Sequence, residues 1–165
     1  MVILGLDPGS VIAGFGAIET EGQITRPADF GCIRTDAKLP FAQRLQKIYR
    51  ELTEVFARIA PDEVAVEEVF FSKNVQSALK IGHARGVMLL AAADAGLPIS
   101  EYSPREVKQA VVGSGSASKE QVQFMVKHLL SLKDVPKPYD TTDALAVALC
   151  HAHRIKMDAM MRKDG

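Results

Sequence analysis

The chain has 165 residues, which is typical of one globular domain and too short for two large ones. Hydrophobic residues make up 47% and charged residues 24%, a balance that excludes an intrinsically disordered chain. The net charge is zero, but residues 72–133 carry 8 basic and 4 acidic residues, whereas residues 1–71 carry 7 and 11. This segregation suits a protein that binds an anionic substrate and cations at one site, although ordinary surface variation gives the same pattern.

The two cysteines, Cys32 and Cys150, belong to no C-x-x-C pair, so the sequence gives no sign of a structural zinc site. Both lie in apolar patterns, and we expect both to be reduced and buried. No signal peptide is recognisable, and the longest apolar stretch, 86–93, is far shorter than the roughly 20 residues of a membrane span. We therefore expect a cytoplasmic protein that does not enter a membrane.

The first third of the chain reads as three short strands, at 2–7, 14–19 and 29–35. The first ends in the turn signal Pro8-Gly9-Ser10. Because the connections are as short as turns, we expect an antiparallel meander.

The pattern then changes to helical spacing. Apolar residues from Phe41 to Ile59 recur at helical intervals with polar residues, Arg44 among them, between them. Pro61 ends this helix, and 63–69 reads as a strand. Since a right-handed crossover joins the helix to it, we expect this strand to lie parallel to an earlier one.

A long helix is predicted over 72–95, with Ala78, Gly82 and Gly86 on one face. These small residues allow close approach either of the sheet or of a second copy of the chain, and the pattern leaves both open. A short strand is predicted over 97–102.

Three further helices complete the chain. Capping boxes beginning at Ser103 and Ser118 predict two of them, the second ending at Leu132, and the last begins at Asp140. We expect one domain over residues 1–155 and a short, frayed tail over 156–165.

Acidic residues stand at places where they could carry chemistry. Asp7 closes the first strand, Glu67 and Glu68 lie within an apolar strand, and Asp140 and Asp143 share one face of the last helix. Each has a plain alternative, because aspartates cap turns and helix starts and the two glutamates could both be solvated. Strand alternation alone does not choose between Glu67 and Glu68.

Together these acids suggest a metal site. Converging carboxylates without a Cys or His cluster suit Mg²⁺ or Mn²⁺, and two such ions would serve phosphoryl transfer. His151 and His153 are two apart on a helix, so they diverge, and we expect them to be at the surface or partly packed.

The basic middle of the chain could contact nucleic acid. Lys119 follows a Gly-Ser loop at a helix start, where backbone N–H groups also favour phosphate. Phe70 and Phe71 are either core residues or aromatics that stack on bases. The candidate contacts, each of which could also be a solvated surface residue, include Lys73, Lys80, Arg85, Arg105, Lys108 and Lys119.

Five segments give the sequence a family resemblance: LGLDPGS at 4–10, GCIRT at 31–35, VEEVFFSKNVQSALKIGHARG at 66–86, VKQAVVGSGSASKEQV at 107–122 and DTTDALAVALCHAH at 140–153. In order and spacing they resemble the bacterial RuvC Holliday junction resolvases over nearly the whole chain. The resemblance implies an α/β, ribonuclease H-like fold: a five-stranded mixed sheet flanked by helices.

The resemblance also implies site residues. The family's metal-binding acids fall on Asp7, Glu67, Asp140 and Asp143, which resolves the choice at 67 and 68. Its DNA-contacting lysines fall on Lys108 and Lys119, and its junction-probing aromatic falls on Phe70. Phe71 stands where close relatives are expected to have Met, and Asp140 where some have His.

The implied activity is Mg²⁺-dependent resolution of Holliday junctions in DNA recombination and repair. Two ions per site, for which Mn²⁺ can substitute, would serve symmetric nicking of two strands by a homodimer, leaving 5′-phosphate and 3′-hydroxyl ends. A branch-migration motor of the RuvA–RuvB type is the implied partner. Two alternatives stay open: an actin-like or sugar-kinase-like phosphotransferase, for which the chain is short, and a DNA-binding module without activity.

Overall fold

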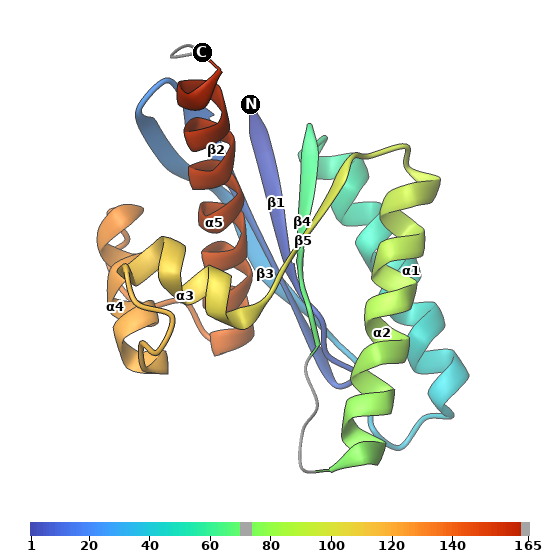
Figure 1. The fold of residues 1–165 in the computed structure, drawn as a ribbon. Coiled ribbons are helices and arrows are strands. Elements are labelled where there is room, and N and C mark those ends of the chain that lie inside the picture. The colour runs from blue at the N-terminus through green and yellow to red at the C-terminus, as the bar shows by residue number, and fades with distance from the viewer. Residues whose placement is uncertain (70–73, 163–165) are drawn as a thin grey trace.

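The computed structural model describes residues 1–69 and 74–162. Within them the chain forms one five-stranded sheet and helices on both of its faces (Figure 1). The strands are β1 (Val2–Asp7), β2 (Ile12–Glu21), β3 (Ile24–Arg34), β4 (Glu63–Glu67) and β5 (Ile99–Tyr102). The helices are α1 (Phe41–Ile59), α2 (Val75–Asp94), α3 (Pro104–Val112), α4 (Lys119–Leu129) and α5 (Tyr139–Met161).

The sheet is mixed and has the order β3-β2-β1-β4-β5. The first three strands form the predicted antiparallel meander, and β4 pairs in parallel with β1, as the crossover predicted. Strand β5 adds in parallel to β4. The carboxyl ends of the central strands β1 and β4 therefore meet at the same edge of the sheet.

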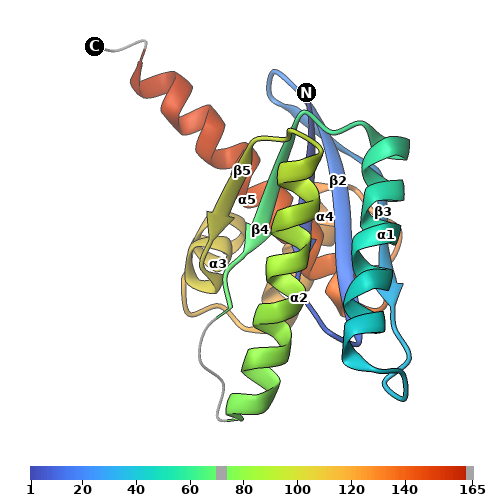
Figure 2. The ribbon, with the colours of Figure 1, turned by 90° about the vertical axis from the view of Figure 1, so that its right-hand side faces the viewer.

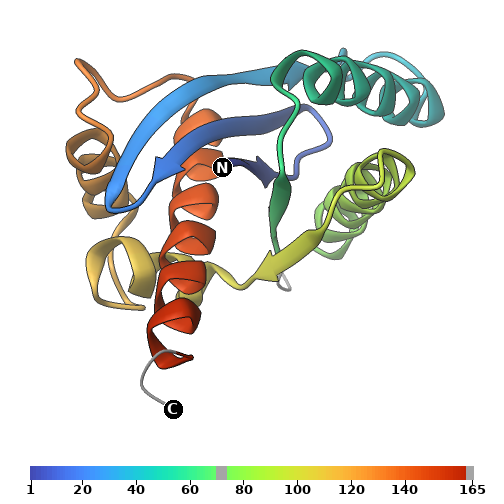
Figure 3. The ribbon, with the colours of Figure 1, turned by 90° about the horizontal axis from the view of Figure 1, so that it is seen from above.

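Two layers of helices enclose the sheet (Figures 1 and 3). Helices α1 and α2 cover one face, and α3, α4 and α5 cover the other. Each face has its own cluster of buried apolar side chains. The C-terminal end of α5 extends past the sheet (Figure 2), so part of the segment expected to be a frayed tail is helical as far as Met161.

Glycines in β1 and β2 let α5 lie directly on the sheet. A Cβ added to Gly5 would stand 2.0 Å from the Ala144 carbonyl oxygen, and one added to Gly14 would stand 2.0 Å from that of Asp140. A side chain at either position would push the helix away. The missing side chains thus bring the first turns of α5 against the end of β1.

The helix starts follow the predicted capping. Ser103 with Glu106 and Ser118 with Gln121 form complete capping boxes. Helix α4 ends at Leu129, short of the predicted Leu132, and α2 begins at Val75, where the Asn74 side chain accepts a hydrogen bond from the Ser77 N–H. None of the helices in the described part of the chain is long and apolar enough to cross a membrane.

Two expectations about burial were wrong, those for Cys32 and His151, and the burial of Arg44 was not foreseen. Cys150 is buried, but Cys32 is only partly buried; both are free. Arg44, counted among the polar residues of its helix, is 5% exposed, and its guanidinium donates to the Ser10 carbonyl and to Thr35 Oγ1.

His151, expected at the surface or partly packed, is 4% exposed. Its Nδ1 lies 2.7 Å from the Tyr102 hydroxyl and its Nε2 lies 2.7 Å from Glu63 Oε2. These two contacts connect α5 to β5 and to β4. They also give the ring nitrogens of the buried His151 hydrogen-bond partners.

Candidate active site

Carboxylates from three elements gather at one edge of the sheet. Asp7 is the last residue of β1 and Glu67 the last of β4. Since Leu6 pairs with Val66, the two acids are next in register on neighbouring strands. Asp140 and Asp143 come from the start of α5, which the glycine contacts hold over β1.

The electrostatics of Asp7 and Glu67 show that these acids act on one another. Burial, and then the charges of Glu67, Asp143 and Asp140, raise the pKa of Asp7 well above its usual value. Burial, and then Asp143, raise the pKa of Glu67 to about 7, although a hydrogen bond with the Asp7 side chain opposes the rise. The pair therefore holds a proton near neutral pH unless a cation compensates its charge.

Two lysines border the carboxylates. Lys119, the first residue of α4, places Nζ 3.2 Å from Asp143 Oδ2. Burial alone would lower the pKa of Lys119, but the combined effect of Asp143, Asp7 and Asp140 outweighs burial and raises it. Burial raises the pKa of Asp143, although the positive charge of Lys119 opposes the rise. The positive charge of Lys108 opposes the rise in the pKa of Glu67.

A small cavity of about 200 Å³ joins these groups between β4, α3, α4 and α5. It brings together two of the four predicted acids and both lysines that the resemblance singled out. Its lining comprises Glu67, Pro104, Val107, Lys108, Lys119, Val122, Asp143 and Ala146.

The donor set fits a hard divalent cation, because carboxylate oxygens are the ligands such ions prefer and these carboxylates repel one another. In the recorded side-chain arrangement, no group of three or more His, Cys, Asp or Glu residues within 1–69 and 74–162 could hold a metal ion. Instead Asp143 faces Lys119, and Asp7 faces Glu67.

The other predicted DNA contacts are placed differently. Phe70 and Lys73 lie outside the residues that the structure describes, as does Phe71. Lys80 is exposed on α2. Arg85 is turned inward: its Nε donates to the Glu67 carbonyl at 3.1 Å and its guanidinium pairs with Glu101. Sequence reasoning missed this link because nothing near Arg85 in the chain marks its partners.

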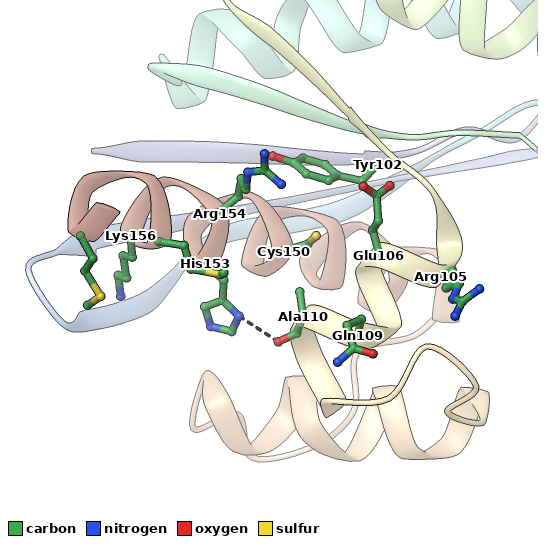
Figure 4. A pocket seen from close by; sticks show the side chains of 11 residues that line it. Tyr102, Arg105, Glu106, Gln109, Ala110, Cys150, His153, Arg154 and Lys156 are labelled. Carbon is green, nitrogen blue, oxygen red and sulfur yellow. Dashed lines mark hydrogen bonds between the residues drawn. The ribbon is translucent and has the colours of Figure 1, made fainter. Parts of the chain in front are cut away.

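A larger cavity, of about 730 Å³, lies elsewhere, between α3 and the C-terminal half of α5 (Figure 4). Across it the His153 ring contacts the Ala110 carbonyl, which ties the two helices together. None of the four predicted acids lines it, so cavity size does not mark the candidate site. Its lining comprises Tyr102, Arg105, Glu106, Gln109, Ala110, Cys150, His153, Arg154, Lys156, Met157 and Met160.

Comparisons with known proteins agree with this geometry. The family described as "Crossover junction endodeoxyribonuclease RuvC" matches residues 3–151. A relative of that description from Desulforamulus reducens is 54% identical over 92% of this chain and 93% of its own. Another, from Pelotomaculum thermopropionicum, is 51% identical over 98% and 99%.

Among solved structures, Thermus thermophilus RuvC in complex with a Holliday junction superposes with a TM-score of 0.90. The two chains are 40% identical, and the match covers 96% of each. The ribonuclease H-like fold implied by the resemblance is thereby confirmed, and the phosphotransferase alternative loses its support. The chain belongs to the RuvC family of crossover junction endodeoxyribonucleases.

Proposed function

We propose that this protein is a divalent-metal-dependent endonuclease that resolves Holliday junctions in DNA recombination and repair. The observation that carries the proposal is the meeting of Asp7, Glu67 and the start of α5 beside Lys119, in a chain of the RuvC family. The T. thermophilus relative, solved with a Holliday junction, supports the same substrate here.

The four acids would hold two Mg²⁺ ions, for which Mn²⁺ can substitute. Such ions, when bound, polarise the phosphodiester and make water a stronger nucleophile. Asp7 interacts with all three other acids, so it would help to hold both ions. Glu67 must lose its proton to serve as a ligand, and Lys119 supplies positive charge where a phosphate would lie.

Hydrolysis of this kind leaves 5′-phosphate and 3′-hydroxyl ends. Products from a synthetic four-way junction should therefore be sealed by a DNA ligase without further treatment. Products that need end repair before ligation would contradict the proposed chemistry.

We also propose that a branch-migration motor of the RuvA–RuvB type is a partner of this protein.

Lys119 is proposed to contact a DNA phosphate. The Lys119→Ala variant should bind a four-way junction about three- to tenfold more weakly and lower the salt dependence of log K by about one phosphate contact. Fluorescence anisotropy over a salt series measures both. Lys127→Ala, in the last turn of the same helix, is the matched control. Unchanged affinity and salt slope in Lys119→Ala would remove Lys119 from the DNA interface.

The homodimer is proposed to form through one face of α2, here called the α2 face: Val75, Leu79, Gly82, Gly86 and Leu90. The three large apolar side chains are exposed, Leu79 to 58%. A Cβ added to Gly82 or Gly86 would meet nothing within 4 Å. The small residues therefore do not pack on the sheet, which leaves a second copy of the chain as the occupant we propose.

Leu79→Asp should dissociate this dimer, because it places a charge in an apolar contact. Analytical ultracentrifugation should show a monomer where the parent is a dimer. Met157→Asp, at a similarly exposed helical methionine on α5, is the control and should stay dimeric. A parent that sediments as a monomer, or a Leu79→Asp variant that stays dimeric, would contradict the assignment.

A further inference from the structure

Arg85 on α2 connects the candidate active site with the α2 face, the surface through which we propose that the dimer forms. Its Nε donates to the carbonyl oxygen of Glu67 at 3.1 Å. Its Nη2 forms an ion pair with Glu101 Oε2 on β5. The Arg85 side chain is 20% exposed and that of Glu101 45%, so the pair is only partly shielded from water.

The contact with Glu67 falls where β4 ends. Beyond this residue one more backbone bond is made, from the Glu68 N–H to the Tyr102 carbonyl, before the chain leaves the sheet. The Glu67 carboxylate interacts with Asp7, Asp143 and both lysines on the α5 side. Arg85, from the helix layer on the opposite face, thus holds the backbone from which this carboxylate projects.

The side chain suits this task because of its shape. A guanidinium presents several N–H donors in a fixed plane, so one group can serve a carbonyl and a carboxylate together. Lysine has one nitrogen and no fixed fork.

Arg85 also borders the α2 face. A groove of about 940 Å³ runs along this face, and Arg85, Glu101, Glu68 and Leu79 are among its lining residues. A second chain bound there would exclude water from the Arg85–Glu101 pair. Because exclusion of water strengthens ion pairs and hydrogen bonds, dimer formation would stiffen the support of Glu67.

We propose that Arg85 is a positioning residue that links assembly of the dimer to the placement of the Glu67 carboxylate. This inference rests on the proposed function and deepens it. It assigns Arg85 to the protein's own framework, in place of the DNA contact expected from the sequence. The observations that carry it are the hydrogen bond to Glu67, the ion pair with Glu101, and the place of Arg85 and Glu101 in the lining of the groove.

The test compares Arg85→Gln, Arg85→Lys and the milder Glu101→Gln with the parent. Arg85→Gln should lower the single-turnover cleavage rate by about ten- to a hundredfold, as small displacements of catalytic groups do. It should also raise, severalfold, the Mg²⁺ concentration that half-saturates the rise in Tm of the DNA-free protein. Junction Kd in EDTA should stay within about twofold. Glu101→Gln should change the rate and the Mg²⁺ response in the same direction by less, and Arg85→Lys should not restore them.

Arg58→Gln is the matched control, since Arg58 on α1 pairs with Asp29 on β3 at the other edge of the sheet. It should leave the Mg²⁺ response unchanged. A role in folding alone would lower Tm without shifting that response, and a DNA contact would weaken junction binding and reduce its salt slope. Either result, or parent-like behaviour of Arg85→Gln, would overturn the inference. If Arg85→Gln fails to fold, Glu101→Gln decides by the same readouts.

The link to assembly is tested in a monomeric background. In Leu79→Asp, adding Arg85→Gln should change the Mg²⁺ response less than it does in the dimer, as a double-mutant cycle measures. Equal changes in both backgrounds would overturn the link. The proposed function fails separately, when the parent itself does not cleave junctions, and the Mg²⁺ response of the DNA-free protein still tests Arg85 in that case.

Discussion

Replacing Asp7 by asparagine is expected to abolish junction cleavage, lowering the single-turnover rate by at least about a thousandfold. Asparagine keeps the size of the side chain but removes the charge that interacts with the other three acids. Junction Kd should change by less than about threefold, because Asp7 lies at a strand end among acids and is not expected to touch DNA directly.

The same variant should be more stable than the parent without metal. Burial, and then the charges of the other three acids, make an ionised Asp7 unfavourable and raise its pKa, and asparagine removes both the buried charge and the repulsion. Thermal unfolding in EDTA should show a higher Tm, and Mg²⁺ should then stabilise the variant less than the parent. Asp158→Asn, near the far end of α5, is the control. Cleavage by Asp7→Asn at the parental rate would contradict the assignment of the site.

Acidic pH is expected to suppress cleavage by one to two orders of magnitude. Glu67 has a pKa of about 7 in the folded chain, so below that pH a proton competes with the cation for the carboxylates. The single-turnover rate at fixed Mg²⁺ should rise about tenfold per pH unit up to about 7 and then level off. Excess Mg²⁺ should move this rise to lower pH. A flat profile between about pH 5.5 and 8 would contradict the prediction.

The stability of the metal-free protein should fall as the pH rises, whereas the cleavage rate should increase. The usual pKa of Glu67 is 4.5 and its folded value is about 7, so between these values the folded chain keeps a proton that the unfolded chain has lost. Stability is then greatest below about pH 4.5, as far as this residue is concerned, and falls as the pH rises toward 7. Tm in EDTA across this range measures the trend, and Glu67→Gln should reduce it.

Local patterns were sufficient to predict the helices and the strands of the sheet. Capping boxes at Ser103 and Ser118 and the apolar spacing after Phe41 specify helix starts through contacts within one or two turns. The choice between Glu67 and Glu68 was different. Alternation along one strand leaves both possible, and the pairing of Leu6 with Val66, which places Glu67 next to Asp7, is a property of two distant segments.

The residues whose surroundings the sequence did not reveal have partners far away in the chain. Arg44 can be buried because Ser10 and Thr35 accept its hydrogen bonds. His151 can be buried because its two ring nitrogens contact Tyr102 and Glu63. From the sequence alone, a charged or polar residue in a helix is expected to be exposed to solvent. Its burial can be predicted only when its hydrogen-bond partners are known. The same holds for Arg85, whose contacts with Glu67 and Glu101 depend on how α2 lies against the sheet.

The most direct test of a metal-dependent, junction-specific nuclease is a cleavage assay on a synthetic four-way junction beside a linear duplex of the same sequence. With Mg²⁺, the parent protein should place paired, symmetric nicks in two strands of the junction and leave the duplex intact, and EDTA should stop the reaction. Tight binding of the junction without nicks, or nicking that persists in EDTA or extends to the linear duplex, would contradict the proposed function.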